Sequence, residues 1–226
     1  MGAVVACKQQ DPPVPTVPSS QTPTSIPESQ PEPTPESDLT TPPEPEIPAH
    51  YTTYTSNESL FSISYPPEWE IITLSIEEVK KAIQEIISDS DMDTSMENAL
   101  QKISIVFLAG LPTEHGYDPN MNIIVEPIPI YLRMPNILVN ANLTNMKNLY
   151  QDYYLHSLTD VVVNGTEATI IEWESTIDGV KTYCMQLIML KGKNGWYVSC
   201  TSIDKNIYEE YKDDFHHIVG SLRIYK

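Results

Sequence analysis

The sequence predicts an α+β fold, an antiparallel β-sheet with helices on both faces, preceded by a disordered proline-rich tether. Turn dipeptides divide the second half of the chain into strand-like segments, and these segments carry apolar runs too continuous for a sheet with one solvated face. The tether is predicted because thirteen of the 20 prolines lie between Pro12 and Pro48. The chain is therefore divided into residues 1–7, a tether at 8–50 and one globular domain at 51–226.

The tether, residues 8–50, consists mainly of Pro, Glu, Ser, Thr and Gln and has almost no aromatic side chains. Such a segment buries too little apolar surface to offset the conformational entropy lost on folding. Proline favours the extended polyproline II conformation, so the contour length is about 120 Å at about 3.1 Å per residue. The tether is expected to hold the domain away from its point of attachment.

The first seven residues end in Val4-Val5-Ala6-Cys7, which resembles a bacterial lipobox. In a lipobox, small apolar residues precede a Cys that is lipidated and becomes the new N-terminus. A signal peptide also has a basic region and a longer apolar region, and both are missing from residues 1–7. The alternatives are an ordinary disordered terminus and, more weakly, N-myristoylation, which requires Ser or Thr where Ala6 stands. Cys7 is thus the expected lipid anchor, on the extracytoplasmic face of a bacterial cell membrane.

The first part of the domain is predicted to contain short strands and two amphipathic helices. Strands are expected at 51–54, 60–65, 69–73, 103–108 and 121–125, and the last two enclose a loop containing Gly110, Pro112, Gly116 and Pro119. The first helix begins at a capping box formed by Ser75 and Glu78. A second helix is expected after Asn142 and extends to Tyr153, following a segment made irregular by Pro127, Pro129 and Pro135.

Residues 158–203 predict a four-stranded antiparallel meander. Three dipeptides can take positive φ at both central positions of a hairpin turn: Asn164-Gly165, Asp178-Gly179 and Asn194-Gly195. They separate strands at 158–163, 166–175, 180–190 and 196–203. A last amphipathic helix, from about Asp204, is expected to cover part of this sheet.

The domain resembles the PsbP-like superfamily, which includes DcrB-like bacterial lipoproteins and a Ran-binding nuclear-import factor. The resemblance covers about 55–226 and depends on four motifs, Phe61-x-Ile63-x-Tyr65-Pro66-x-x-Trp69, Val163-Asn164-Gly165-x-x-Ala168, Gly195-Trp196-Tyr197 and Phe215-x-x-Ile218-x-x-Ser221-Leu222. It implies an α/β/α sandwich with a non-enzymatic accessory role, typically the binding of another protein. Photosynthetic members stabilise a metal centre that belongs to their partner, and no residue here carries that role over.

No catalytic, cofactor or metal site is predicted. The calcium-loop pattern of Asp89, Asp91 and Asp93 has Thr94 and Leu100 where Gly and Glu are needed. His216 and His217 are adjacent on the last helix and point about 100° apart, so they cannot readily share one metal ion. Nucleophile-elbow, dinucleotide-binding and phosphate-loop motifs are missing from the sequence. Clustered Lys and Arg are missing as well, which argues against nucleic acid.

Cys184 and Cys200 lie in neighbouring strands of the predicted meander and are a candidate disulfide. A two-residue Asn194-Gly195 turn places them on opposite faces, whereas a longer loop from Lys191 to Gly195 allows them to face each other. Bridging requires Cα atoms within about 7 Å. The alternative is a pair of buried free thiols.

The expected function is that of a membrane-anchored, non-catalytic module that binds an extracytoplasmic protein. The domain contains 24 acidic and 12 basic residues, which favours a basic partner. Tyr117 and Tyr131, in the proline-interrupted connections, are the candidate partner surface, since function often lies in loops on a rigid sheet; the alternative is that both pack on the domain. A small-ligand or metal-ion carrier with a pocket beside the sheet is the second functional hypothesis.

Overall fold

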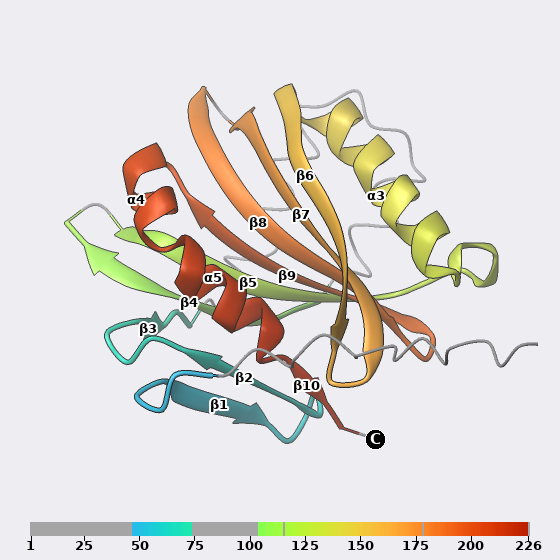
Figure 1. The fold of residues 1–226 in the computed structure, drawn as a ribbon, viewed down its shortest axis with the longest axis horizontal. Coiled ribbons are helices and arrows are strands. Elements are labelled where there is room, and N and C mark those ends of the chain that lie inside the picture. The colour runs from blue at the N-terminus through green and yellow to red at the C-terminus, as the bar shows by residue number, and fades with distance from the viewer. Residues whose placement is uncertain (1–46, 74–103, 115, 178, 226) are drawn as a thin grey trace, which may run out of the picture. The chain divides into compact units, whose positions relative to one another are not determined.

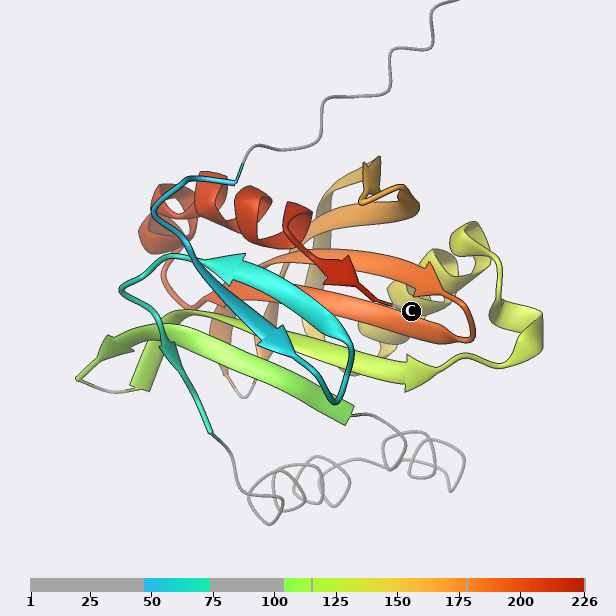
Figure 2. The ribbon, with the colours of Figure 1, turned by 90° about the horizontal axis from the view of Figure 1, so that it is seen from below.

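The computed structural model describes residues 47–73, 104–114, 116–177 and 179–225, which are mostly antiparallel β-strands with few helices (Figure 1). A seven-stranded sheet has the order β3-β4-β5-β9-β8-β7-β6, and a three-stranded sheet has the order β1-β2-β10. The larger sheet comprises β3 (Glu70–Ile71), β4 (Ser104–Thr113), β5 (Gly116–Pro127), β6 (Gln151–Val163), β7 (Thr166–Ile177), β8 (Val180–Lys191) and β9 (Asn194–Ser202). The smaller sheet comprises β1 (Thr52–Ser56), β2 (Phe61–Tyr65) and β10 (Arg223–Ile224), and Figure 2 shows β10 directly after the last helix.

The predicted meander is confirmed as β6 to β9, with one turn displaced. Asn164 and Gly165 take φ of 48° and 70° between β6 and β7, as a type I′ turn requires. The turn between β8 and β9 is instead Gly192-Lys193, with φ of 63° at Gly192, while Asn194 is already in β9 and pairs with Lys191. The Asn194-Gly195 turn was therefore a wrong prediction.

Two groups of side chains alternate along β8 and pack with different helices. Met185, Leu187 and Met189 belong to a cluster that includes residues of α4 (Lys205–Glu210) and α5 (Lys212–Gly220). Cys184 and Ile188 belong to a second cluster, with residues of α3 (Pro135–Leu149). Because successive side chains of a strand point to opposite faces, the two clusters lie on opposite faces of β8.

The helices differ from the predicted ones at their boundaries. Pro135 occupies the first turn of α3, where its missing N–H costs nothing, so the helix begins before Asn142, and Tyr153 lies in β6. The predicted last helix is two helices that meet at Tyr211, and the Asp204 side chain caps the first by accepting hydrogen bonds from the N–H groups of Asn206 and Ile207.

The predicted loop between β4 and β5 is largely strand. Gly110 and Pro112 lie within β4, at a shift in the pairing register with β5, and Pro119 lies within β5. Irregular pairing tolerates proline, which has no N–H to donate to a neighbouring strand. The predicted helix at Ser75 and the aspartates Asp89, Asp91 and Asp93 lie outside the described residues.

Candidate functional site

A groove of about 590 Å³ lies between the first turns of α3 and the strands β6 and β7. Its apolar lining includes Val139 of α3 and the exposed Leu158 and Val162 of β6. Two carboxylates, Asp160 and Glu167, add negative charge to the same lining, and Asp160 accepts a hydrogen bond of 2.9 Å from the Thr169 hydroxyl. The arrangement combines apolar contact area with charges that are suited to a basic group.

The segment just before α3 exposes large apolar side chains. The 3-10 turn η1 (Ile130–Leu132) and the residue before Pro135 leave Ile130 80%, Tyr131 72% and Met134 55% exposed. Met134 directly precedes Pro135 and Asn136, which line the groove, so the apolar segment leads into the groove along the chain. Large exposed apolar side chains that gather in one place are typical of a surface that binds another molecule.

Other residues fix this segment to the domain. Ile128 is buried, and its N–H donates to the carbonyl of Lys193 in the β8–β9 turn at 2.8 Å. The Arg133 Nε donates to the Ile128 carbonyl at 2.8 Å, and Leu132 packs against the cluster below α3. The exposed side chains therefore stand on an anchored turn, which reduces the entropy lost when a partner binds.

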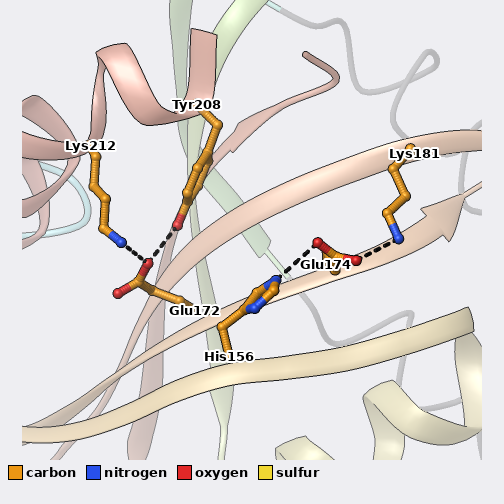
Figure 3. A network of polar contacts seen from close by, with 6 residues as sticks. All are labelled: His156, Glu172, Glu174, Lys181, Tyr208 and Lys212. Atoms are coloured by element: carbon orange, nitrogen blue, oxygen red, sulfur yellow. Dashed lines mark hydrogen bonds and ion pairs between the residues drawn. The ribbon is translucent and has the colours of Figure 1, made fainter. Parts of the chain in front are cut away.

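A polar network occupies the opposite face, where β6, β7 and β8 meet α4 and α5 (Figure 3). Glu172 of β7 accepts hydrogen bonds from Ser157 (3.1 Å) and Tyr208 (3.2 Å) and pairs with Lys212 (2.5 Å). Glu174, two residues along the strand, pairs with Lys181 at 2.7 Å and with His156 at 3.0 Å. The two carboxylates thus connect the sheet to the helices above it and to the neighbouring strands.

Each of the two carboxylates in this network is paired with a lysine. Burial alone would raise the pKa of Glu172, but the hydrogen bond and charge of Lys212, together with the hydrogen bonds from Ser157 and Tyr208, outweigh burial, and the pKa is lowered. The hydrogen bond from Lys181 is the main cause of the lowered pKa of Glu174. Ser157 and His156 bind different carboxylates, so they do not form the serine–histidine–carboxylate relay of a hydrolase. The arrangement is that of a stabilising ion-pair network.

The described part of the chain offers no metal centre and no membrane-crossing helix. None of its groups of three or more His, Cys, Asp or Glu side chains could hold a metal ion. His216 lies on α5 and its side chain is exposed. Within the same residues, no helix is long and apolar enough to span a bilayer.

The two predicted surface tyrosines do not form one site. Tyr131 is strongly exposed on η1, whereas Tyr117, only marginally exposed, lies near the start of β5. β5 separates them, and ten residues of extended strand span about 34 Å. Only Tyr131 belongs to the apolar segment beside the groove.

Cys184 and Cys200 are free and buried, which corrects the candidate disulfide. The pairing register puts Cys184 opposite Thr201 and Cys200 opposite Met185, so the two thiols point to opposite faces of the sheet. Burial raises the pKa of both thiols. Cys7 lies outside the described residues.

Sequence reasoning missed Ile130, Met134 and the residues that line the groove. A signal was available for the first two, because the run from Ile128 to Met134 is apolar apart from Arg133 and contains proline but has neither helical nor strand periodicity. For Asp160 and Glu167 no such signal exists, since they become neighbours of α3 only in the folded chain.

No family model and no curated protein sequence matches this chain. Cyanobacterial PsbP (CyanoP) from Synechocystis sp. PCC 6803 aligns with a TM-score of 0.53 and 11% identity, over 79% of this chain and 94% of that one. LpqN of Mycobacterium tuberculosis, involved in cell envelope biogenesis, aligns with a TM-score of 0.50 and 9% identity, over 78% and 91% of the two chains. At such identities the likeness concerns the fold alone, and the domain of this protein accordingly has a PsbP-like fold.

Proposed function

We propose that this protein is a non-catalytic binding module, anchored through Cys7 at the extracytoplasmic face of a membrane, that holds a protein partner at the groove beside α3. The observation that carries the proposal is the exposed apolar segment of Ile130, Tyr131 and Met134 on an anchored turn. An accessory role is in keeping with the structural neighbours, of which LpqN is involved in cell envelope biogenesis.

The charge of the chain favours a basic partner. The formal net charge is −18, and Asp160 and Glu167 bring part of it to the groove. Glu172 and Glu174, on the opposite face, are already paired with lysines. The groove therefore offers carboxylates beside exposed apolar surface, a combination that attracts a cationic partner and then gains from burial.

Site-specific photocrosslinking tests the proposal. A photoreactive phenylalanine analogue at position 131 is expected to crosslink a defined protein in the cells that make this chain, and the same analogue at exposed Glu209 of α4 is not. With the purified partner, Tyr131→Ser should weaken binding at least about fivefold, because anchoring aromatic residues contribute more than about 1 kcal/mol.

Tyr117→Ser is the matched control, since the same substitution at the other end of β5 should leave affinity unchanged. Tyr131→Ser should also leave the melting temperature within a few degrees, because the side chain is largely exposed. Equal crosslinking at positions 131 and 209, or equal weakening by the two serine variants, would contradict the proposal.

A small-ligand carrier is the second candidate, because the groove volume of about 590 Å³ lies within the range of ligand sites. Its apolar lining with a few polar groups also fits such a site. Native mass spectrometry distinguishes the two functions, since a carrier purified gently should retain a small molecule that Leu158→Trp, at an exposed residue of the lining, displaces. A binding module should show only the mass of the protein and its anchor.

A further inference from the structure

In the described part of the chain, β6 is the edge strand of the seven-stranded sheet and lines the groove. β6 pairs with β7 alone among the described residues, and from Ser157 to Val163 the pairing with Thr166–Glu172 is regular. The outer side of this stretch presents backbone N–H and C=O groups in the spacing that another strand requires. The groove and this free edge are thus parts of one continuous surface.

Features that normally protect an edge strand are scarce here. Proteins shorten, bulge or charge their edges, above all with lysine, to prevent pairing with other chains. The opposite edge, β3, is only two residues long. The bulges of β6 fall before Ser157, and its regular part, Leu158–Val163, has Asp160 as its single charge and ends in three valines. This stretch has the composition of a strand ready to pair.

Alternation places three of its side chains toward the groove. Leu158, Asp160 and Val162 point to one face and line the groove, with an apolar residue on each side of the carboxylate. A strand added outside β6 would place its own alternate side chains beside these three. Cross-strand neighbours interact directly, so the favoured pattern is apolar, basic, apolar at every second position.

We propose that the β6 edge binds an extended segment of a basic partner protein by backbone pairing along Ser157–Val163, with a Lys or Arg side chain beside Asp160 and apolar side chains beside Leu158 and Val162. This inference rests on the proposed function and adds that the partner binds as an extended strand. Pairing supplies affinity through the backbone, and the alternating pockets supply specificity.

A second copy of this chain is a poorer occupant. The antiparallel register that places Leu158 opposite Val162 also places the two Asp160 carboxylates opposite each other, and like charges in that position are destabilising. Each copy also carries a formal net charge of −18, so two copies repel each other. A basic segment places no carboxylate opposite Asp160 and is attracted, not repelled, by the net negative charge of this chain.

The test uses the isotope-labelled full chain and the acetylated, amidated peptide Thr-Val-Thr-Lys-Thr-Val-Thr. NMR titration should show saturable shifts of the amides from Ser157 to Val163 and of those lining the groove. N–H groups of alternate residues point to opposite sides of a strand, so of two peptides N-methylated at alternate positions only one should lose binding. The peptide with Glu in place of Lys should bind more weakly than the parent.

Asp160→Asn should weaken the lysine peptide about two- to fivefold, the size of one cross-strand charge pair. Glu209→Gln, an equal change of charge on α4, should have no effect. Any one of four results would overturn the inference: amide shifts outside β6 and the groove, equal binding of both N-methylated peptides, absence of binding, or a dimer formed through β6. Crosslinking at position 131 is a separate readout, so the proposed function stands or fails independently.

Discussion

Glu172 has a folded-state pKa below its ordinary value of 4.5, so its contacts are linked to stability and to pH. The stabilisation is present above that ordinary value and is lost as the pH falls through the lower, folded-state pKa. Lys212→Met removes the ion pair, and we expect it to lower the free energy of unfolding by about 1 kcal/mol at neutral pH.

The difference should shrink as the pH falls below 4.5 and Glu172 becomes protonated in the native protein as well. Urea unfolding at several pH values measures it, with Lys205→Met, an exposed lysine on α4, as the control. A deficit that stays the same at every pH would show that Lys212 acts through packing rather than through the pair.

The two buried thiols give a second prediction for single residues. Cys7→Ser leaves Cys184 and Cys200 as the remaining cysteines of the full chain. Because both are buried with raised pKa values, a thiol reagent should react slowly with the native protein and should label both thiols once denaturant unfolds it without a reductant. Failure to label either thiol after unfolding would indicate a disulfide and a different register of β8 and β9.

At the scale of elements, the apolar segment before α3 contains one isoleucine that is buried in the domain and another that is exposed to solvent. Ile128 is 2% exposed and Ile130 is 80% exposed, two residues apart in the same segment. Ile128→Ala should lower the free energy of unfolding by about 2–5 kcal/mol, whereas Ile130→Ala should change it by less than about 0.5 kcal/mol. Chemical denaturation measures both variants, and each is the matched control for the other. Equal losses would mean that Ile130 packs in the core.

At the scale of the whole molecule, the anchor and the domain are expected to be separable. Cys7→Ala should move the protein from the membrane fraction to the soluble fraction, because Cys7 is the proposed site of lipidation. Binding of the purified partner should be unchanged, since the groove is built from residues after 128. Fractionation followed by immunodetection measures the first result, with Ser19→Ala in the tether as the control. A Cys7→Ala protein that stays with the membrane after a high-pH wash would contradict the anchor.

The local part of the fold follows from the sequence alone. The Asn164-Gly165 turn and the continuous apolar runs between the turn dipeptides predicted β6 to β9, because turn geometry and strand composition depend on neighbouring residues. Pro135 could have been interpreted as the first residue of α3 for the same reason. Of the exposed apolar segment, only Tyr131 was predicted, as a loop residue on a rigid sheet.

Tertiary structure decided the remaining features, because they depend on segments distant in sequence. Gly195 is not a turn residue but lies within β9, where a Cβ atom would lie 2.8 Å from the Cδ1 atom of Ile128, and the turn residue with positive φ is Gly192. The register of β8 and β9 places Cys184 and Cys200 on opposite faces, as the predicted two-residue Asn194-Gly195 turn would also have done. The groove exists because α3 lies against β6 and β7, a contact that no local pattern specifies. The sequence by itself determined most of the meander and its Asn164-Gly165 turn, and only the packing of distant segments decided the turn at Gly192 and the groove beside α3.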